Sequence, residues 1–162
     1  MNLFEHIFRE LNRAQVKYLV VGGVAVNLYG YTRFTGDLDI LVLLNESNLS
    51  KLEGVMKKLG YSERLPVSIM DLGDKNQVKK WLKEKNMKAY TFNPPKNNLL
   101  QIDVIIEESL KFESYYKRRK TKSMQRIKIP VVSLDDIIQM KKRAKRDKDV
   151  LDLKVLKYLS GL

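Results

Sequence analysis

The chain has no cysteine and only one histidine, His6, among its 162 residues. Without cysteine it can form no disulfide, perform no thiol catalysis and build no cysteine-ligated metal site. A single histidine can neither complete a Ser-His-Asp triad nor make a zinc site, so His6 is interpreted as a residue on the face of a helix. Carboxylates remain as metal ligands, and they favour magnesium or manganese.

Long hydrophobic runs are also missing. None approaches the roughly 20 residues that cross a bilayer, and the N-terminal MNLFEHIFRE carries acids where a signal peptide would be basic and then apolar. We therefore expect a cytoplasmic protein with no membrane partner. No repeat, low-complexity segment or long linker divides the chain. This predicts one domain, 1–162, with a catalytic core of sheet and helices over 1–130 and a C-terminal helix pair over 131–162 packed on it.

Positive charge, by contrast, is plentiful and unevenly placed. The net charge is +12; residues 1–81 hold 11 basic and 9 acidic side chains, whereas residues 82–162 hold 20 and 10. The first half is therefore at +2 and the second at +10, which favours a polyanionic partner such as nucleic acid or nucleotide phosphates. The alternative is a lysine-rich solvated surface with no such partner.

Hydrophobic periodicity predicts alternating helices and strands. Helices are expected at 2–14, 24–30, 47–59, from a turn at 71–74 to about 84, and at 109–117, 134–146 and 149–159. Strands are expected at 17–21, 37–44, 61–64, 87–93, 99–106 and 129–133. This order predicts an α/β or α+β fold in which helices pack against a central sheet.

Three aspartates interrupt two strands that otherwise read as buried. Asp37 and Asp39 are two residues apart in DLDILVLL, so their side chains point to the same face, and Asp103 lies in LLQIDVIIE. Paired carboxylates at the edge of a core repel each other and lose hydration. Divalent cations held between them and a polyanion would stabilise them, as in two-metal phosphoryl transfer. An ordinary acid at the edge of a strand is the alternative for Asp103.

Gly22-Gly23 stands between the strand at 17–21 and the helix at 24–30. A glycine pair there lets backbone N–H groups approach phosphate oxygens beside a helix N-terminus. Such pairs also occur as turn glycines only. Each of these motifs is common by itself. Their combination is much rarer: a strand, Gly-Gly, a helix, Asp-x-Asp on a second strand and a later Asp on a third.

This order resembles the minimal nucleotidyltransferases of the DNA polymerase beta superfamily. VGG is followed by thirteen residues and then by Asp37-Leu38-Asp39, and Ile102-Asp103-Val104 matches the later hydrophobic-Asp-hydrophobic strand. GYTRFTGDLDI, together with SLDDIIQMKKRAKRDKDVLDL, is closer to a bacterial and archaeal subgroup related to the AbiEii-type toxin nucleotidyltransferases. The resemblance covers about 18–44, 99–106 and 131–153, while 47–98 carries no recognisable motif.

The resemblance implies a polymerase beta-like nucleotidyltransferase fold and the transfer of NMP from an NTP, with release of pyrophosphate. Two Mg²⁺ or Mn²⁺ ions would be held by three catalytic aspartates, namely Asp37, Asp39 and Asp103. Nucleotide contacts would come from Gly22, Gly23, Arg33, Thr35, Lys141 and Arg146. Asp149 and Asp152 would orient Lys141, or would pair with Arg146; Arg33 would clamp the triphosphate or pair with Asp37.

The position of the basic residues indicates which kind of molecule would accept the NMP. Tyr115 and Tyr116 precede the basic run KRRKTKSMQRIK, and basic residues mixed with aromatic ones can follow a nucleic-acid backbone. We therefore expect a nucleic-acid acceptor, with tRNA as the candidate, ahead of a protein or a small molecule. The rival hypothesis is a degenerate member of the fold that acts as a nucleic-acid-binding or antitoxin-type module. The sequence leaves the base of the NTP and the oligomeric state open.

Overall fold

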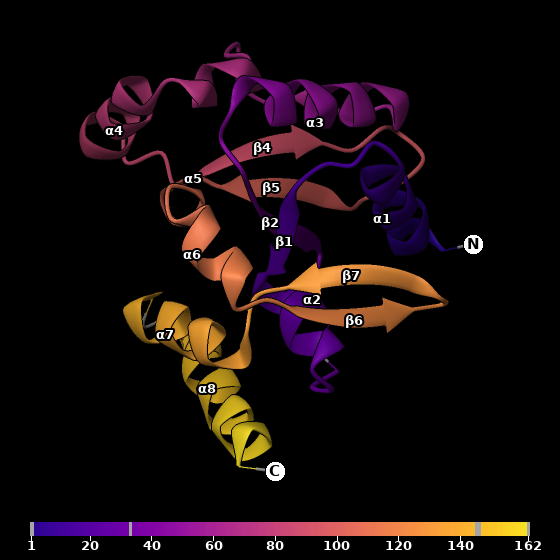
Figure 1. Ribbon diagram of the computed structural model, residues 1–162, viewed down its shortest axis with the longest axis vertical. Coiled ribbons are helices and arrows are strands. Elements are labelled where there is room, and N and C mark those ends of the chain that lie inside the picture. The colour runs from indigo at the N-terminus through magenta and orange to yellow at the C-terminus, as the bar shows by residue number, and fades with distance from the viewer. Residues whose placement is uncertain (1, 33, 145–146, 162) are drawn as a thin grey trace.

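The computed structural model describes residues 2–32, 34–144 and 147–161, with side chains described outside 144–152. Seven strands form one mixed sheet in the order β3-β4-β5-β2-β1-β7-β6. Figure 1 shows α3 and α4 at one end of the molecule, beyond β4, and α7 and α8 at the other end. The fold class expected from the sequence is confirmed: a mixed sheet flanked by helices.

The strands pair both parallel and antiparallel. β2 is parallel to β5 and β1 is parallel to β7, while the other neighbouring pairs are antiparallel. Their bounds are β1 Tyr18–Val21, β2 Asp37–Val42, β3 Ser62–Glu63, β4 Ala89–Asn93, β5 Gln101–Ile105, β6 Lys120–Met124 and β7 Ile127–Val131. β1 is buried on both faces, which explains its continuous apolar sequence.

Several helices begin where the sequence offers a capping side chain, whereas α2, α5 and α6 have no side-chain cap. Asn2, Asn45 and Asp74 accept backbone N–H bonds at the starts of α1, α3 and α4, and the Ser133 hydroxyl accepts from the Asp136 N–H at 3.1 Å before α7. The bounds are α1 Leu3–Arg13, α2 Gly22–Leu28, α3 Glu46–Lys58, the 3₁₀ helix η1 Ile69–Gly73, α4 Lys75–Glu84, α5 Ile106–Ser109, α6 Phe112–Lys117, α7 Leu134–Ala144 and α8 Asp147–Ser160.

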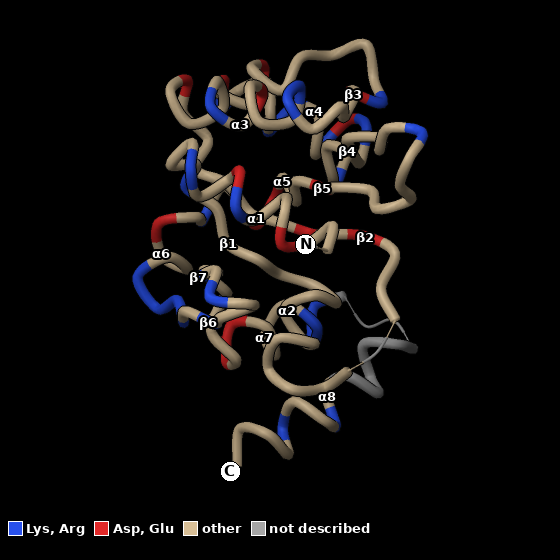
Figure 2. The backbone as a smooth tube through the Cα atoms, turned by 90° about the vertical axis from the view of Figure 1, so that its right-hand side faces the viewer, with Lys and Arg blue, Asp and Glu red and all other residues tan. Residues whose placement is uncertain are grey.

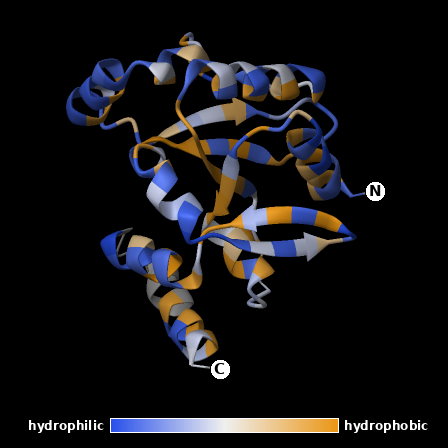
Figure 3. Cartoon of the chain, viewed as in Figure 1, coloured by the Kyte–Doolittle hydropathy of each residue, from blue (hydrophilic) through white to orange (hydrophobic). Residues whose placement is uncertain are grey.

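The core lies between the sheet and the apolar faces of its helices. Ile7, Phe8 and Leu11 of α1 are fully buried, and the Phe8 ring stacks on Tyr18 of β1 with centroids 6.2 Å apart. His6, on the other side of α1, is exposed, as its interpretation required. Figure 3 shows hydrophobic residues concentrated on β1 and a mostly hydrophilic α4. No helix among the described residues is both long enough and apolar enough to cross a membrane.

One buried polar side chain ties together the ends of β1 and β2. Asn48 of α3 is 4% exposed, and its amide bonds to the backbone N–H and C=O of Lys17 at 2.7 and 2.9 Å and to the Leu43 carbonyl at 3.0 Å. These bonds satisfy backbone groups just outside the two strands. They also fix the start of β1 opposite the end of β2, and so the register of the pair that carries the aspartates.

Three sequence expectations need correction. The single helix expected at 109–117 is two short helices, α5 and α6. The basic run 117–128 contains strand β6, where no strand was expected. Gly22 and Gly23 are the first two residues of α2, whereas a turn before a helix at 24–30 was expected.

Candidate active site

A row of side chains crosses four strands at the point where β1 ends. Thr91 of β4 is the register partner of Asp103, Asp103 is the partner of Asp39 on β2, and Asp39 is the partner of Val21 on β1. Register partners on adjacent strands point to the same face. The two aspartates, far apart in sequence, are therefore neighbours on one face of the sheet, and Asp37 lies two residues before Asp39 on the same face of β2.

Gly22 closes this row on the side of β1. Its φ is +67°, and a Cβ added to it would lie 2.4 Å from the Asp39 Oδ2 and 3.1 Å from the Asp39 Cγ. A carboxylate oxygen therefore packs directly against the backbone at the start of α2. Both the positive φ and the close approach require glycine at this position. Gly23, next to it, is buried.

The three aspartates differ in their surroundings. Asp37 is exposed, whereas Asp39 and Asp103 are half-buried. The Asp103 carboxylate accepts a hydrogen bond from the Thr91 hydroxyl at 2.7 Å and from the Gln101 amide nitrogen at 3.1 and 3.2 Å. Asp103 is therefore held from β4 and from its own strand.

A cavity of about 510 Å³ opens beside Asp39. Its floor is apolar and comes from β1, β2, β5 and α7. Its rim is charged, with three acids and four bases. The lining residues are Val21, Gly22, Asp39, Leu41, Lys88, Ile105, Glu107, Glu108, Lys111, Ile137, Met140, Lys141 and Arg143. An apolar cavity of this size with a few charged groups is typical of sites for small ligands.

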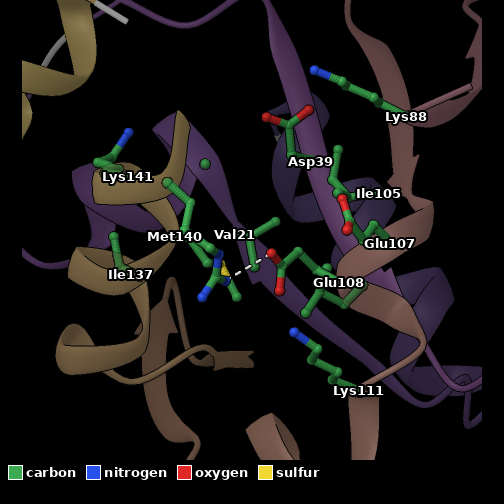
Figure 4. A pocket seen from close by; sticks show the side chains of 13 residues that line it. Val21, Asp39, Lys88, Ile105, Glu107, Glu108, Lys111, Ile137, Met140 and Lys141 are labelled. Atoms are coloured by element: carbon green, nitrogen blue, oxygen red, sulfur yellow. Dashed lines mark hydrogen bonds and ion pairs between the residues drawn. The ribbon is translucent and has the colours of Figure 1, made fainter. Parts of the chain in front are cut away.

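Lys141 and Asp39 lie on opposite walls of this cavity (Figure 4). Lys141 is only 6% exposed, while its neighbour Lys142 is exposed. Helical spacing places consecutive residues on different faces, so only one of the two lysines can face the sheet. Lys141 therefore lies in the wall of the cavity that Asp39 also lines, and its role as a nucleotide contact stays a prediction.

Thr35 and two arginines were also expected to contact the nucleotide. The Thr35 hydroxyl donates to the Asp37 backbone carbonyl at 3.0 Å, so in this structure it shapes the entry to β2. Arg33 and Arg146 lie outside the described residues. Asp149 and Asp152 belong to α8, and their side chains lie outside the described part of the chain.

The metal site can be tested on its donors and their register. Asp37, Asp39 and Asp103 share one face and offer only oxygen, which suits hard cations such as Mg²⁺. Among the described side chains, no group of three or more acids or histidines is gathered closely enough to hold an ion. The donor chemistry and the backbone register therefore fit a metal, while the Asp103 carboxylate is engaged with Thr91 and Gln101 in this structure.

Sequence reasoning missed several residues at this site. Glu108 pairs with Arg143 of α7 at 2.7 Å and accepts a bond from the Tyr115 hydroxyl, so one acid links α5, α6 and α7. Gln101 could have been found, since it lies two residues before Asp103 on the same strand face. Thr91 could not, because only the pairing of β4 with β5 brings it to Asp103.

The basic run has partners of its own. Arg118 donates two bonds to Asp136, at 2.9 and 3.0 Å, and the Arg119 guanidinium lies 3.8 Å from the centre of the Tyr116 ring. Lys117 and Lys120 are exposed. Figure 2 shows Lys and Arg gathered where α6 meets β6. Two of the four basic residues at 117–120 are thus already engaged within the protein.

Comparison with known proteins gave matches among solved structures alone: no family model and no curated protein matches the chain. The lincosamide antibiotic adenylyltransferase LnuA, solved with lincomycin, has a TM-score of 0.62 at 16% identity, covering 96% of this chain and 95% of its own. The antibiotic-resistance factor ANT(2'')-Ia has a TM-score of 0.60 at 12% identity, with coverages of 95% and 80%.

A nucleotidyltransferase-like protein from Paracoccidioides brasiliensis has a TM-score of 0.58 at 16% identity, covering 93% of this chain and 71% of its own. Identities this low show a shared fold and nothing finer. The closeness to the AbiEii-type subgroup therefore stays a prediction. What the comparisons establish is that this chain has the polymerase beta-like nucleotidyltransferase fold.

Proposed function

We propose that this protein is a metal-dependent nucleotidyltransferase that transfers NMP from an NTP to a hydroxyl acceptor. The observation that carries the proposal is the register of Asp39 with Asp103, directly beside Gly22. It gathers on one sheet face the carboxylates that the sequence resemblance assigns to catalysis. A structural role explains such a pair poorly, because two neighbouring carboxylates destabilise each other.

Asp37, Asp39 and Asp103 would hold two Mg²⁺ or Mn²⁺ ions. When bound, these ions would neutralise phosphate charge and acidify the acceptor hydroxyl. Asp103 would take the proton of that hydroxyl, whose oxygen bonds to the α-phosphorus of the NTP. The bond from that phosphorus to the oxygen bridging the β-phosphate breaks, and pyrophosphate leaves.

The cavity beside Asp39 is proposed as the nucleotide site. Gly22 has no side chain to obstruct phosphate oxygens, and Lys141 supplies a buried positive charge in the opposite wall of the cavity. Arg33, Thr35 and Arg146 remain proposed nucleotide contacts. Such a site uses binding energy to align the α-phosphorus with the acceptor.

Calorimetric titration tests this function. Each Mg-NTP is titrated into the wild type, into Asp39→Ala and into the control Asp71→Ala, which removes an exposed acid on η1. We expect one or more nucleotides to bind the wild type and the control equally, and Asp39→Ala to lose at least about tenfold in affinity. Equal binding by all three proteins, or none by the wild type, would contradict the proposal.

The acceptor is proposed to be a nucleic acid, with tRNA as the candidate. The +10 charge of residues 82–162 supports this proposal, because RNA needs several phosphate contacts over a broad surface. A protein acceptor is the next candidate. A small-molecule hydroxyl is the third, and it is favoured by LnuA and ANT(2'')-Ia, whose own names refer to antibiotics.

Transfer of label from α-³²P-NTPs in a cell lysate separates these acceptors. Label in RNA supports the first proposal, and label in protein or in a small molecule replaces it. The degenerate module remains the rival function: it predicts binding to nucleic acid with no label transfer and no nucleotide binding.

A further inference from the structure

The Asp103 carboxylate is held by two donors, one from β4, on the side away from Asp39, and one from its own strand. β5 lies between β4 and β2 in the sheet, so Thr91 flanks Asp103 on one side and Asp39 flanks it on the other. The Thr91 hydroxyl donates to Oδ1 at 2.7 Å, and the Gln101 Nε2 donates to Oδ1 at 3.1 Å and to Oδ2 at 3.2 Å. Bonds to an ionised acceptor are among the stronger hydrogen bonds in proteins.

These bonds make the two oxygens of Asp103 different. A carboxylate oxygen accepts about two hydrogen bonds. Among the residues that the structure describes, Thr91 and Gln101 fill both positions on Oδ1, whereas Gln101 alone bonds to Oδ2 and leaves one position there. The remaining acceptor position on Oδ2 is the one that a cation or an acceptor hydroxyl can use.

Arg64 fixes the direction of the Gln101 amide. Its Nη2 donates to the Gln101 Oε1, its Nε donates to the Asn93 Oδ1 at 3.1 Å, and its backbone N–H donates to the Thr91 carbonyl at 3.1 Å. A guanidinium offers donors only, so Gln101 must turn its oxygen towards Arg64 and its nitrogen towards Asp103. Arg64 thus reaches Asp103 through one amide group and contacts both β4 and β5.

We propose that Thr91 and Gln101 are positioning residues for Asp103, and that Arg64 sets the Gln101 amide so that Oδ2 is the reacting oxygen. This inference rests on the proposed nucleotidyltransferase function. The physical reason lies in the two neighbouring carboxylates. Asp39 repels Asp103, so without its hydrogen-bond donors the Asp103 side chain would rotate away from Asp39. Donors at Oδ1 hold the carboxylate in one orientation instead, as groups around a metal ligand commonly do.

Thr91 offers a matched pair of variants. Thr91→Val keeps the shape and β-branching of the residue and removes the hydroxyl, whereas Thr91→Ser keeps the hydroxyl. Thr121→Val is the control, since Thr121 is exposed on β6, which β7 and β1 separate from the strands that carry the aspartates. Gln101→Met and Arg64→Met test the second donor and its orientation. Urea unfolding of every variant shows that each one is folded.

Two measurements report on Asp103. The first is Mn²⁺ affinity, followed by the electron paramagnetic resonance signal of free Mn²⁺, which needs no acceptor. The second is the split between kcat and KM for the NTP in the label-transfer reaction. We expect Thr91→Val and Gln101→Met to lose about 10- to 100-fold in Mn²⁺ affinity or kcat, with the KM within about threefold of the wild type. Thr91→Ser should retain wild-type values within about threefold, and Arg64→Met should fall between the two groups.

The outcomes separate this inference from the function beneath it. Wild type that binds Mn²⁺ and nucleotide, together with a Thr91→Val variant that behaves like Thr121→Val, would overturn the positioning role alone. A Thr91→Ser variant as impaired as Thr91→Val would also overturn it, because the hydroxyl would then be irrelevant. Wild type that binds neither Mn²⁺ nor nucleotide overturns the proposed function, and the inference with it.

Discussion

Gly22→Ala should be among the most damaging conservative substitutions in this protein. The new Cβ would lie 2.4 Å from the Asp39 Oδ2, about 1 Å closer than an ordinary contact. It would also hold an L-residue at φ +67°. The left-handed backbone contributes about 1–2 kcal/mol of destabilisation and the overpacking about 1–3 kcal/mol, giving about 2–5 kcal/mol in total. That is a large part of the roughly 5–15 kcal/mol that stabilises a domain.

Gly54→Ala is the matched control. Gly54 lies inside α3, and a Cβ added there meets nothing within 4 Å. Alanine should therefore stabilise the helix by about 0.5–1 kcal/mol. Urea unfolding followed by far-UV circular dichroism, with the fluorescence of the single tryptophan, Trp81, as second probe, measures both changes.

A double-mutant cycle separates the backbone part from the steric part. In an Asp39→Ala background the Oδ2 and Cγ atoms are gone, so Gly22→Ala should destabilise mainly through its backbone, by about 1–2 kcal/mol. The coupling between the two positions should then be about 1–3 kcal/mol. Additive effects, or a Gly22→Ala variant as stable as wild type and equal in Mg-NTP binding, would refute the close packing of Gly22 against Asp39.

Three further predictions concern the cavity, alkaline stability and the basic run. Lys141→Met should weaken Mg-NTP binding about tenfold or more, because it removes a charge from the cavity wall, while Lys142→Met should leave calorimetric affinity unchanged. Burial, with the bond to Glu108, raises the pKa of Tyr115 to about 12, so the folded state holds this phenol proton more tightly than the unfolded chain does. The raised pKa of Tyr115 contributes to the free energy of unfolding in full below the unfolded pKa of about 10, and this contribution is lost as the pH rises towards 12. Tyr115→Phe should therefore reduce the fall of the unfolding free energy between about pH 10 and 12. Neutralising 117–120 should weaken tRNA binding and its salt dependence in filter-binding assays. The control neutralises four exposed lysines, Lys79, Lys80, Lys83 and Lys85. If the 117–120 variant binds tRNA as tightly as the wild type, or if the control loses as much tRNA affinity as that variant, then residues 117–120 are only a solvated surface.

The sequence predicted the elements that carry the site because their local pattern is strong. β1 and β2 are short β-branched runs bounded by glycine or polar residues, and the structure places them within two residues of the expected bounds. The Asp-x-Asp spacing correctly placed Asp37 and Asp39 on one face. A pattern of period two gives this result without knowledge of any neighbouring strand.

The elements that the sequence missed lack such a pattern. β6 is KTKSM, a polar edge strand whose pairing comes from β7 alone. The turn of that hairpin is Gln125-Arg126, with φ of 48° and 70°, where glycine or asparagine would have signalled it. The contacts of Asp103 with Thr91 depend on strand order, which local periodicity does not contain.

The position of Asp39 beside the glycine pair follows from the pairing of β1 with β2. The chain leaves the sheet at Val21, passes through α2 and a return loop, and re-enters so that Asp39 pairs with Val21. A slip of one residue in this pairing would turn Asp37 and Asp39 towards the opposite, buried face and place apolar side chains beside Gly22. Asn48 opposes such a slip at the far end of the two strands, where it bonds to Lys17 and Leu43. The number of residues between Gly23 and Asp37 can therefore vary without moving the carboxylates, because the register is held by the strands and by Asn48.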